Sequence, residues 1–175
     1  MEKLIIDSTH SEVGFKIKHL MISTVRGYFS EFEGSAEKEN DKYNVEFSLK
    51  TSSVNTNNQD RDKHLISEDF FDSEKYPTID FMSRYVDLNS PIINGYITVK
   101  GITKPISLDV VYNGTNVDPW GNKKHGFEIS GKINRKDFNL TWNAPLSDGG
   151  LLLDDQVHLN LEVQMLEVVP QLENA

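Results

Sequence analysis

Apolar and polar residues alternate along most of this chain, which is the pattern of a β-strand with one face buried. The clearest case is residues 43–51, where Tyr43, Val45, Phe47 and Leu49 alternate with polar side chains. Eight segments of this kind are separated by turns or loops. They are residues 13–20, 24–36, 43–51, 79–85, 93–99, 106–112, 127–133 and 157–165.

The alternation itself limits the fold class. Strands buried on one face only are typical of antiparallel sheets, and no long amphipathic helix separates one strand from the next, as a parallel sheet would require. The prediction is therefore an all-β fold. Eight antiparallel strands can form a sandwich or close as a barrel. Closure would remove the exposed sheet edges, and an eight-stranded barrel just holds side chains or one small ligand.

The segment from Asp60 to Ser83 interrupts the alternation between the third and fourth strands. Ile66 and Phe70 are four residues apart, which places them on one helical face. Ser67 is followed by two acids, a pattern typical of a helix start. We expect a helical insertion of one or two turns that Pro77 ends, since proline forces the residue before it into an extended conformation.

Length and composition narrow the class of protein. A chain of 175 residues fits one domain, and it has no cysteine, which excludes thiol nucleophiles and disulfides. The net charge of −9 argues against nucleic acid or an anionic membrane as partner. The N-terminus has three consecutive apolar residues, too few for a signal peptide or a membrane span. We therefore expect a cytoplasmic protein, or a periplasmic or secreted one if Met1 replaces a removed signal.

No catalytic or metal-binding motif stands out. The chain lacks a nucleophile elbow, a phosphate-binding glycine loop and a metal-type histidine spacing. We therefore predict no catalytic residue, no metal ligand and no cofactor. An enzyme would need His19 or His64 to face a cavity beside a carboxylate. The histidines, each expected to be structural or on the surface, are His10, His19, His64, His125 and His158.

Arg61 and His64 are polar residues on the predicted short helix, next to the apolar Leu65. One interpretation is a polar clamp on a ligand head group, because the forked donors of arginine suit a phosphate or carboxylate. The preferred alternative is that Arg61 pairs with a nearby acid and ties the helix to the barrel wall.

Several motifs carry a family resemblance when they are read in order. They are His10-Ser11-x-Val13-x-Phe15, Lys18-His19-Leu20, Val25-x-Gly27-x-Phe29-x-x-Phe32, Ser53-Val54-Asn55-Thr56, Arg61-Asp62-x-His64-Leu65, Asp69-Phe70-Phe71-Asp72, Tyr76-Pro77-x-Ile79-x-Phe81, Gly101-Ile102-Thr103-Lys104-Pro105, Ile133-Asn134-Arg135-x-Asp137-Phe138, Gly149-Gly150 and Asp155-x-Val157. Together they resemble the YceI-like family of bacterial polyisoprenoid-binding proteins, from about Ile6 to Val163.

The resemblance implies one lipocalin-like domain, with an eight-stranded antiparallel barrel at about residues 6–168 and a tail at 169–175. It also implies non-catalytic binding, transport or storage of a polyisoprenoid or fatty-acyl lipid in the barrel, and a homodimer without stable membrane insertion. Alternatives are an enzyme acting on a lipid-like substrate and an interaction or stress protein with a filled barrel. The residues expected to contact the ligand are Phe15, Ile17, Phe29, Phe47, Leu49, Leu65, Phe70, Phe71, Phe81, Arg61 and His64.

Overall fold

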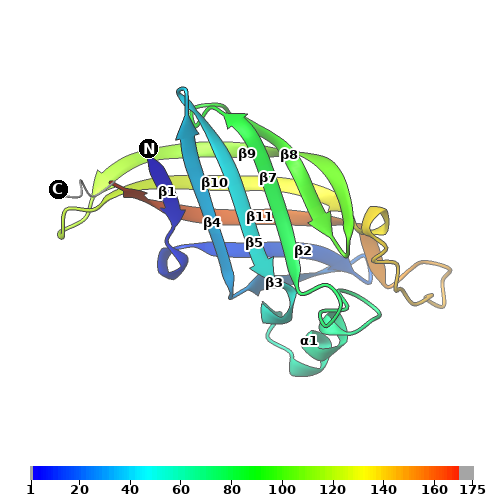
Figure 1. Cartoon of the computed structure of the whole chain (residues 1–175). Helices are drawn as coiled ribbons and strands as arrows, with labels where there is room; N and C mark the ends of the chain where they lie inside the picture. Colours follow the sequence, from blue (N-terminus) through cyan, green and yellow to red (C-terminus); the bar gives the residue numbers. More distant parts are fainter. Residues whose placement is uncertain (1, 170–175) are drawn as a thin grey trace.

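The strands of the chain form one antiparallel sheet that closes into a barrel. A computed structural model describes residues 2–169 (Figure 1). The predicted tail therefore lies outside the described residues except for Val169. The strands are β1 (Lys3–Ile6), β2 (Glu12–His19), β3 (Ser23–Phe29), β4 (Phe32–Glu39), β5 (Lys42–Lys50), β6 (Val54–Asn55), β7 (Thr78–Val86), β8 (Ile92–Val99), β9 (Ile102–Val117), β10 (Lys123–Asn134) and β11 (Leu153–Val168).

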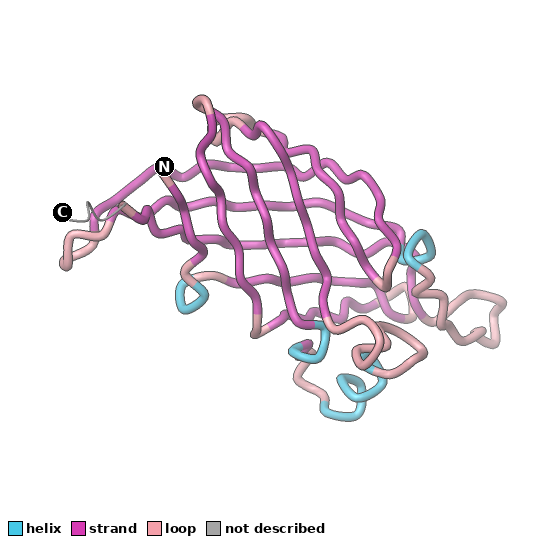
Figure 2. Tube along the Cα trace, viewed as in Figure 1, coloured by secondary structure: helices cyan, strands magenta, loops and turns pink. Residues whose placement is uncertain are grey.

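Some of the eleven strands run end to end, so the barrel has eight continuous strand positions, which we call staves. The predicted eight-stranded barrel is therefore confirmed. β1 and β2 follow one another along β11, and on their other side β4 pairs with β1 and β3 pairs with β2. β5 and β6 likewise run along β4 and β3. β5 pairs with β7, from β7 to β11 each strand pairs with the next, and all pairs are antiparallel. This is the simplest up-and-down order, because every stave lies beside its neighbour in sequence (Figure 2).

β1 closes the barrel because it pairs with β11 on one side and β4 on the other. Leu4, in the middle of β1, is fully buried opposite Glu167 and Ala36. Together with Ala36 and Tyr43, Leu4 forms a buried cluster near the β4–β5 turn. Side chains therefore fill this end of the barrel.

The helices and the longer loops gather at the other end of the barrel (Figure 1). They are α1 (Gln59–Ile66), η2 (Thr51–Ser53) and η3 (Arg135–Phe138), while η1 (Ser8–His10) links β1 to β2. α1 lies between the third and fourth staves, as predicted. No helix within residues 2–169 is long and apolar enough to span a bilayer.

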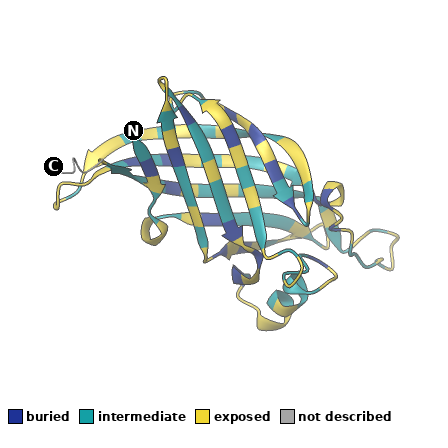
Figure 3. Cartoon of the chain, viewed as in Figure 1, coloured by how far each residue is buried: buried dark blue, intermediate teal, exposed yellow. Residues whose placement is uncertain are grey.

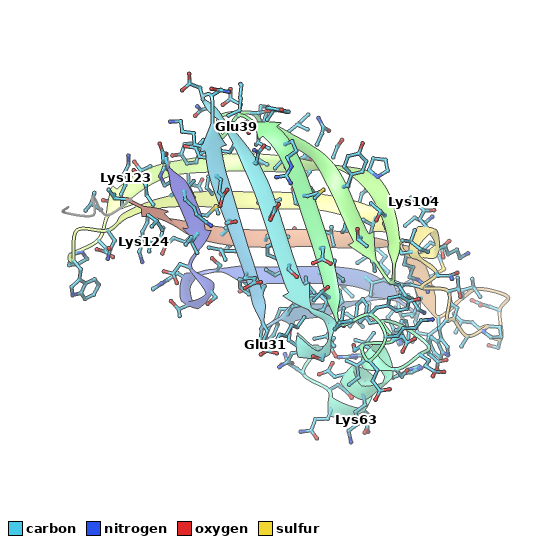
Figure 4. The ribbon with its side chains drawn as sticks, in the orientation of Figure 1. Glu31, Glu39, Lys63, Lys104, Lys123 and Lys124 are labelled. Carbon is cyan, nitrogen blue, oxygen red and sulfur yellow. The ribbon has the colours of Figure 1, made fainter. Side chains whose placement is uncertain are left out.

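Exposed and buried positions alternate along the strands, as the sequence pattern predicts (Figure 3). Charged side chains such as Glu31, Lys63 and Lys104 point away from the barrel (Figure 4). The apolar members of each strand therefore face the interior, where they meet those of every other stave.

Two local predictions are wrong. The polar composition of residues 113–125 predicts a loop, but β9 continues to Val117 and β10 begins at Lys123, because these polar residues pair with one another across the two strands. Ser67 does not start a helix. It follows the last turn of α1 as its C-cap, and its N–H donates to the carbonyl of His64 (3.2 Å). Phe70 thus lies in a series of turns rather than on a helical face.

Candidate functional site

The barrel encloses a cavity of about 660 Å³. Its wall is almost entirely apolar, and nearly every stave contributes to it. The cavity extends from Ile6 and Met165, beside the filled end, to Trp142 and Leu152 at the end that carries the helices. The cavity is thus an apolar site whose lining residues come from both ends of the barrel.

All eleven residues predicted as ligand contacts line this cavity. Strand residues reach it because alternate side chains point inward. Phe15 also turns across β3, since Gly27 stands opposite it and carries no side chain; a Cβ there would lie 2.5 Å from the Phe15 ring. Their contact with a ligand remains a prediction. The cavity-lining set is Phe15, Ile17, Phe29, Phe47, Leu49, Leu65, Phe70, Phe71, Phe81, Arg61 and His64.

Aromatic side chains pack where the insertion meets the barrel. The ring of Phe71 meets Phe29 edge to face at a centroid distance of 5.8 Å, and Phe29 lies 5.6 Å from Phe15. Phe70 is buried against Trp142, with ring centroids 5.4 Å apart. The turns after α1 thus cover the barrel with large apolar groups.

His64 joins α1 to the loop between η3 and β11. Its ring lies edge-on to Trp142 (4.7 Å) and to Phe70 (5.0 Å), and its Nε2 lies 2.8 Å from Asp69 Oδ2. A histidine of the cavity wall thus meets an exposed carboxylate that does not itself line the cavity. Within residues 2–169, no hydroxyl group is hydrogen-bonded to the ring of His64 or to that of His19, which also lines the cavity. The pair therefore has no hydroxyl nucleophile beside it.

Arg61 holds the start of α1 in place. Its Nε donates to Thr56 Oγ1 (2.7 Å) and its Nη2 donates to the Thr56 carbonyl (2.6 Å). Thr56 Oγ1 in turn donates to Asp62 Oδ1 (2.6 Å), and Asn58 caps the helix through the N–H of Arg61 (3.0 Å). The guanidinium thus ties the helix to the barrel, as one interpretation of the sequence expected, but through Thr56 rather than through an acid.

The rim of the cavity lies between α1 and the β2–β3 hairpin. Beyond Tyr28, where β6 ends its pairing with β3, residues 23–27 are paired only with β2. Val25 on this free edge lines the cavity, as do the exposed Asn58 and Asp60 next to and on α1. The free edge of β3 and the exposed polar residues beside it together make this side the opening to solvent.

Arg135 is a cavity-wall residue that sequence reasoning did not assign to the site. Only 2% of it is exposed. Its Nε donates to the Asp154 carbonyl (2.8 Å), and its Nη1 donates to the carbonyls of Leu140 (2.6 Å) and Trp142 (2.8 Å). Burial lowers the pKa of Arg135. The one signal of this role in the sequence is a charged residue just after a predicted strand. In the structure, Arg135 holds the loop that carries Trp142.

The filled end also contains a polar network. The buried His125 lies 2.8 Å from the Tyr112 hydroxyl through Nδ1 and 3.1 Å from Glu167 through Nε2. Nearby, Tyr43 donates to Glu2 (2.6 Å); this bond, aided by Lys38, holds the pKa of Glu2 below its ordinary value. Burial raises the pKa of Tyr43. The described residues contain no cluster of three side chains suited to a metal ion.

Comparisons with known proteins agree with this geometry. The family model described as "YceI-like domain" matches residues 4–165. Protein YceI of Escherichia coli is 43% identical over 141 residues, which cover 77% of this chain and 73% of that protein. The crystal structure of the Campylobacter jejuni YceI protein superposes with a TM-score of 0.70 at 35% identity, covering 93% and 96% of the two chains. A polyisoprenoid-binding domain from Saccharophagus degradans gives 0.72 at 13% identity, covering 94% and 98%.

The closed sheet and its apolar interior define a lipocalin-like barrel with an internal cavity. The chain belongs to the YceI-like family, as its sequence motifs indicated. The Saccharophagus domain shares the fold alone, since its identity is low.

Proposed function

We propose that this protein binds a long-chain amphiphile, a polyisoprenoid or a fatty-acyl lipid, inside the barrel and without catalysis. The observation that carries the proposal is the cavity of about 660 Å³ with an almost wholly apolar wall. The description of the Saccharophagus domain as polyisoprenoid-binding supports the same class of ligand.

The energetics suit a chain-like ligand. Each buried methylene contributes roughly 0.8 kcal/mol, so ten of them contribute roughly 8 kcal/mol before the cost of association is subtracted. An apolar wall thus supplies affinity without a specific head-group contact. The hydrocarbon chain of the ligand lies along the barrel. Its polar end lies at the rim beside Arg61 and His64, where solvent reaches it.

Lipid uptake by delipidated protein tests this proposal. Phe47→Trp adds bulk inside the cavity and should reduce uptake of a fluorescent fatty acid or a polyprenol, while circular dichroism shows the barrel intact. Met82→Trp is the matched control, because Met82 lies on the same sheet with 44% of its surface exposed and is absent from the cavity wall. The control should take up lipid like the native protein.

Two results would contradict the proposal. A folded native protein that takes up neither lipid and yields none on extraction would show that the cavity is not a lipid site. Equal uptake by the Phe47→Trp and native proteins would show that the ligand lies elsewhere.

The contact between His64 and Asp69 favours one alternative, hydrolysis of a lipid-like substrate. We propose against it, because within residues 2–169 no hydroxyl group is hydrogen-bonded to the His64 ring, and because the Saccharophagus neighbour is described as a binding domain. Mass spectrometry of a long-chain ester incubated with the protein decides the point; release of acid that His64→Gln abolishes would make the protein an enzyme.

We also propose that the protein forms a homodimer and works as a carrier or store of its ligand. Both statements rest on the family resemblance. Light scattering after gel filtration gives the mass in solution, and a mass equal to one chain at micromolar concentration would contradict the dimer.

The cytoplasmic location of the protein stays a prediction.

A further inference from the structure

In the turn between β2 and β3, the backbone adopts a conformation that the residues there disfavour. Leu20 and Met21 adopt left-handed conformations, with φ of 55° and 59°. The β4–β5 turn of the same barrel also has two left-handed residues, and there they are Asn40 and Asp41 (48° and 66°). Asn, Asp and Gly are the residues that tolerate such φ values, whereas Leu and Met are strained in them. The β2–β3 turn thus keeps large apolar residues at a conformational cost.

These residues project into solvent. The exposed fraction is 38% for Leu20, 73% for Met21 and 87% for Ile22. Leu151, 44% exposed, belongs to the adjoining loop, where a Cβ on Gly150 would lie 4.0 Å from the sulfur of Met21. We call Leu20, Met21, Ile22 and Leu151 the apolar tip. Strained backbone that supports exposed apolar groups indicates a contact surface rather than a folding device.

The hairpin behind the apolar tip is locally basic. Residues 13–30 contain Lys16, Lys18 and Arg26 but no acid, in a chain whose net charge is −9. Lys16 and Arg26 stand opposite each other in the β2–β3 register. Within residues 2–169, none of these three cations lies within ion-pair distance of a carboxylate. We call the three cations the basic hairpin.

Acids do lie on the neighbouring strand. Asp154 and Asp155 fall in the irregular part of β11, beside the end of β2. Asp155 is paired with Lys136 at 3.2 Å, however, and Asp154 accepts backbone N–H groups through Oδ1. The positive charge of the basic hairpin is therefore not neutralised by direct contact.

The apolar tip adjoins the opening of the cavity. The N–H of Leu20 donates to the carbonyl of Leu152 (2.9 Å), and Leu152, His19 and Val25 all line the cavity. The tip and the cavity rim therefore belong to the same end of the barrel, and a surface that receives the tip also faces the opening.

The net charge of −9 disfavours an anionic membrane for the surface as a whole, but the charge of the β2–β3 hairpin is locally positive. We therefore propose that the apolar tip and the basic hairpin dock the protein on a bilayer that contains anionic phospholipid, with the cavity rim facing the membrane. Apolar side chains that enter the head-group region, backed by cations that attract anionic lipid, are the two components of interfacial membrane binding. This proposal goes beyond the binding of a ligand in the cavity, because docking is measured separately from uptake.

Vesicle flotation tests it with the full chain. The native protein should float with phosphatidylcholine vesicles that contain phosphatidylglycerol, and less with pure phosphatidylcholine or at high salt. The double variant Leu20→Asn/Met21→Gly places turn-favoured residues at the strained positions, so it should fold at least as well. It should lose vesicle affinity by about tenfold or more, and so should Lys16→Gln/Lys18→Gln/Arg26→Gln.

A control variant and two further measurements, of lipid uptake and of oligomeric mass, complete the test. Trp120→Ser removes a residue 83% exposed at the β9–β10 turn, toward the filled end, and should leave vesicle binding unchanged. Uptake of lipid from solution should be the same in the turn variant and the native protein, which separates docking from ligand binding. Vesicle binding that survives the turn variant, or that Trp120→Ser abolishes, would overturn the proposal. So would a turn variant that changes only the oligomeric mass, since a second copy would then cover the tip.

Discussion

Asp7, at the start of η1, shows how one carboxylate joins distant parts of the chain. It accepts hydrogen bonds from Thr9 Oγ1 (2.7 Å) and Lys124 Nζ (3.0 Å) and lies 3.0 Å from His10 Nδ1. Hydrogen bonding from Thr9, then from Lys124 and His10, holds its pKa well below the ordinary value although partial burial opposes this. The charged form of Asp7 is therefore bound more favourably in the folded state than in the unfolded state.

A pH-dependent stability follows from that shift. The folded-state pKa lies below the unfolded one, so the contribution of Asp7 is complete above about pH 4 and is lost as the pH falls toward the folded pKa. Asp7→Asn should lower the free energy of unfolding at pH 7 by about 1–3 kcal/mol, and less at pH 3. Urea unfolding at both values measures this. Asp109→Asn, an exposed control on β9, should leave the free energy of unfolding unchanged at both pH values. An effect of Asp7→Asn that is independent of pH would contradict the account.

Single residues divide into those whose role the sequence pattern reveals and those it hides. Inward positions such as Phe47 and Phe81 follow from period-two alternation, because the strand geometry alone decides which way they point. Arg135 and Trp142 follow no such pattern. They line the cavity because a loop folds back over the barrel. The carbonyls of this loop become hydrogen-bond partners of Arg135 only in the folded chain.

At the scale of one element, Thr56, which lies outside α1, ties down the start of the helix. The helix has eight residues and buries none of them, and helices this short are marginal in water. Thr56→Val keeps the shape of the side chain but removes the hydroxyl that contacts Asp62 and Arg61. It should destabilise the segment by roughly 1–3 kcal/mol.

Hydrogen exchange followed by mass spectrometry measures this local effect. Amides of residues 59–66 should exchange faster in Thr56→Val, while those of β9 and β10 keep native protection. Thr78→Val is the control, because it removes an exposed hydroxyl whose partner is Asp80 on β7 and not a residue of α1. Faster exchange across the whole barrel would mean that α1 and the sheet unfold together.

The elements also show where sequence reasoning ends. Eight staves were predictable because each alternates strongly, and the resemblance to a known family fixed their closure into a barrel. The helix boundaries were not. Ser67 with two acids after it resembles a helix start, but its hydroxyl donates to the His64 carbonyl (2.6 Å), and that contact ends α1. Local propensity cannot decide between a start and a stop when the same hydroxyl serves both.

At the scale of the whole molecule, a cavity of about 660 Å³ affects stability as well as binding. A ligand that binds only the closed barrel stabilises it by mass action, by about 2.7 kcal/mol at a concentration one hundred times its Kd. For a domain of this size, that gain corresponds to about 5–10 °C in Tm. Delipidated protein should therefore melt at a lower temperature than protein loaded with a polyprenol or a fatty acid.

Calorimetry on loaded and delipidated samples measures the difference. Phe47→Trp should show a smaller gain on loading, because the added ring occupies space that the chain would fill, whereas Met82→Trp, outside the cavity, should gain as much as the native protein. The expected order of gains is thus native equal to Met82→Trp and above Phe47→Trp. Equal gains in all three would place the ligand on the outer surface, and a cavity that never takes up lipid would leave Tm unchanged in each.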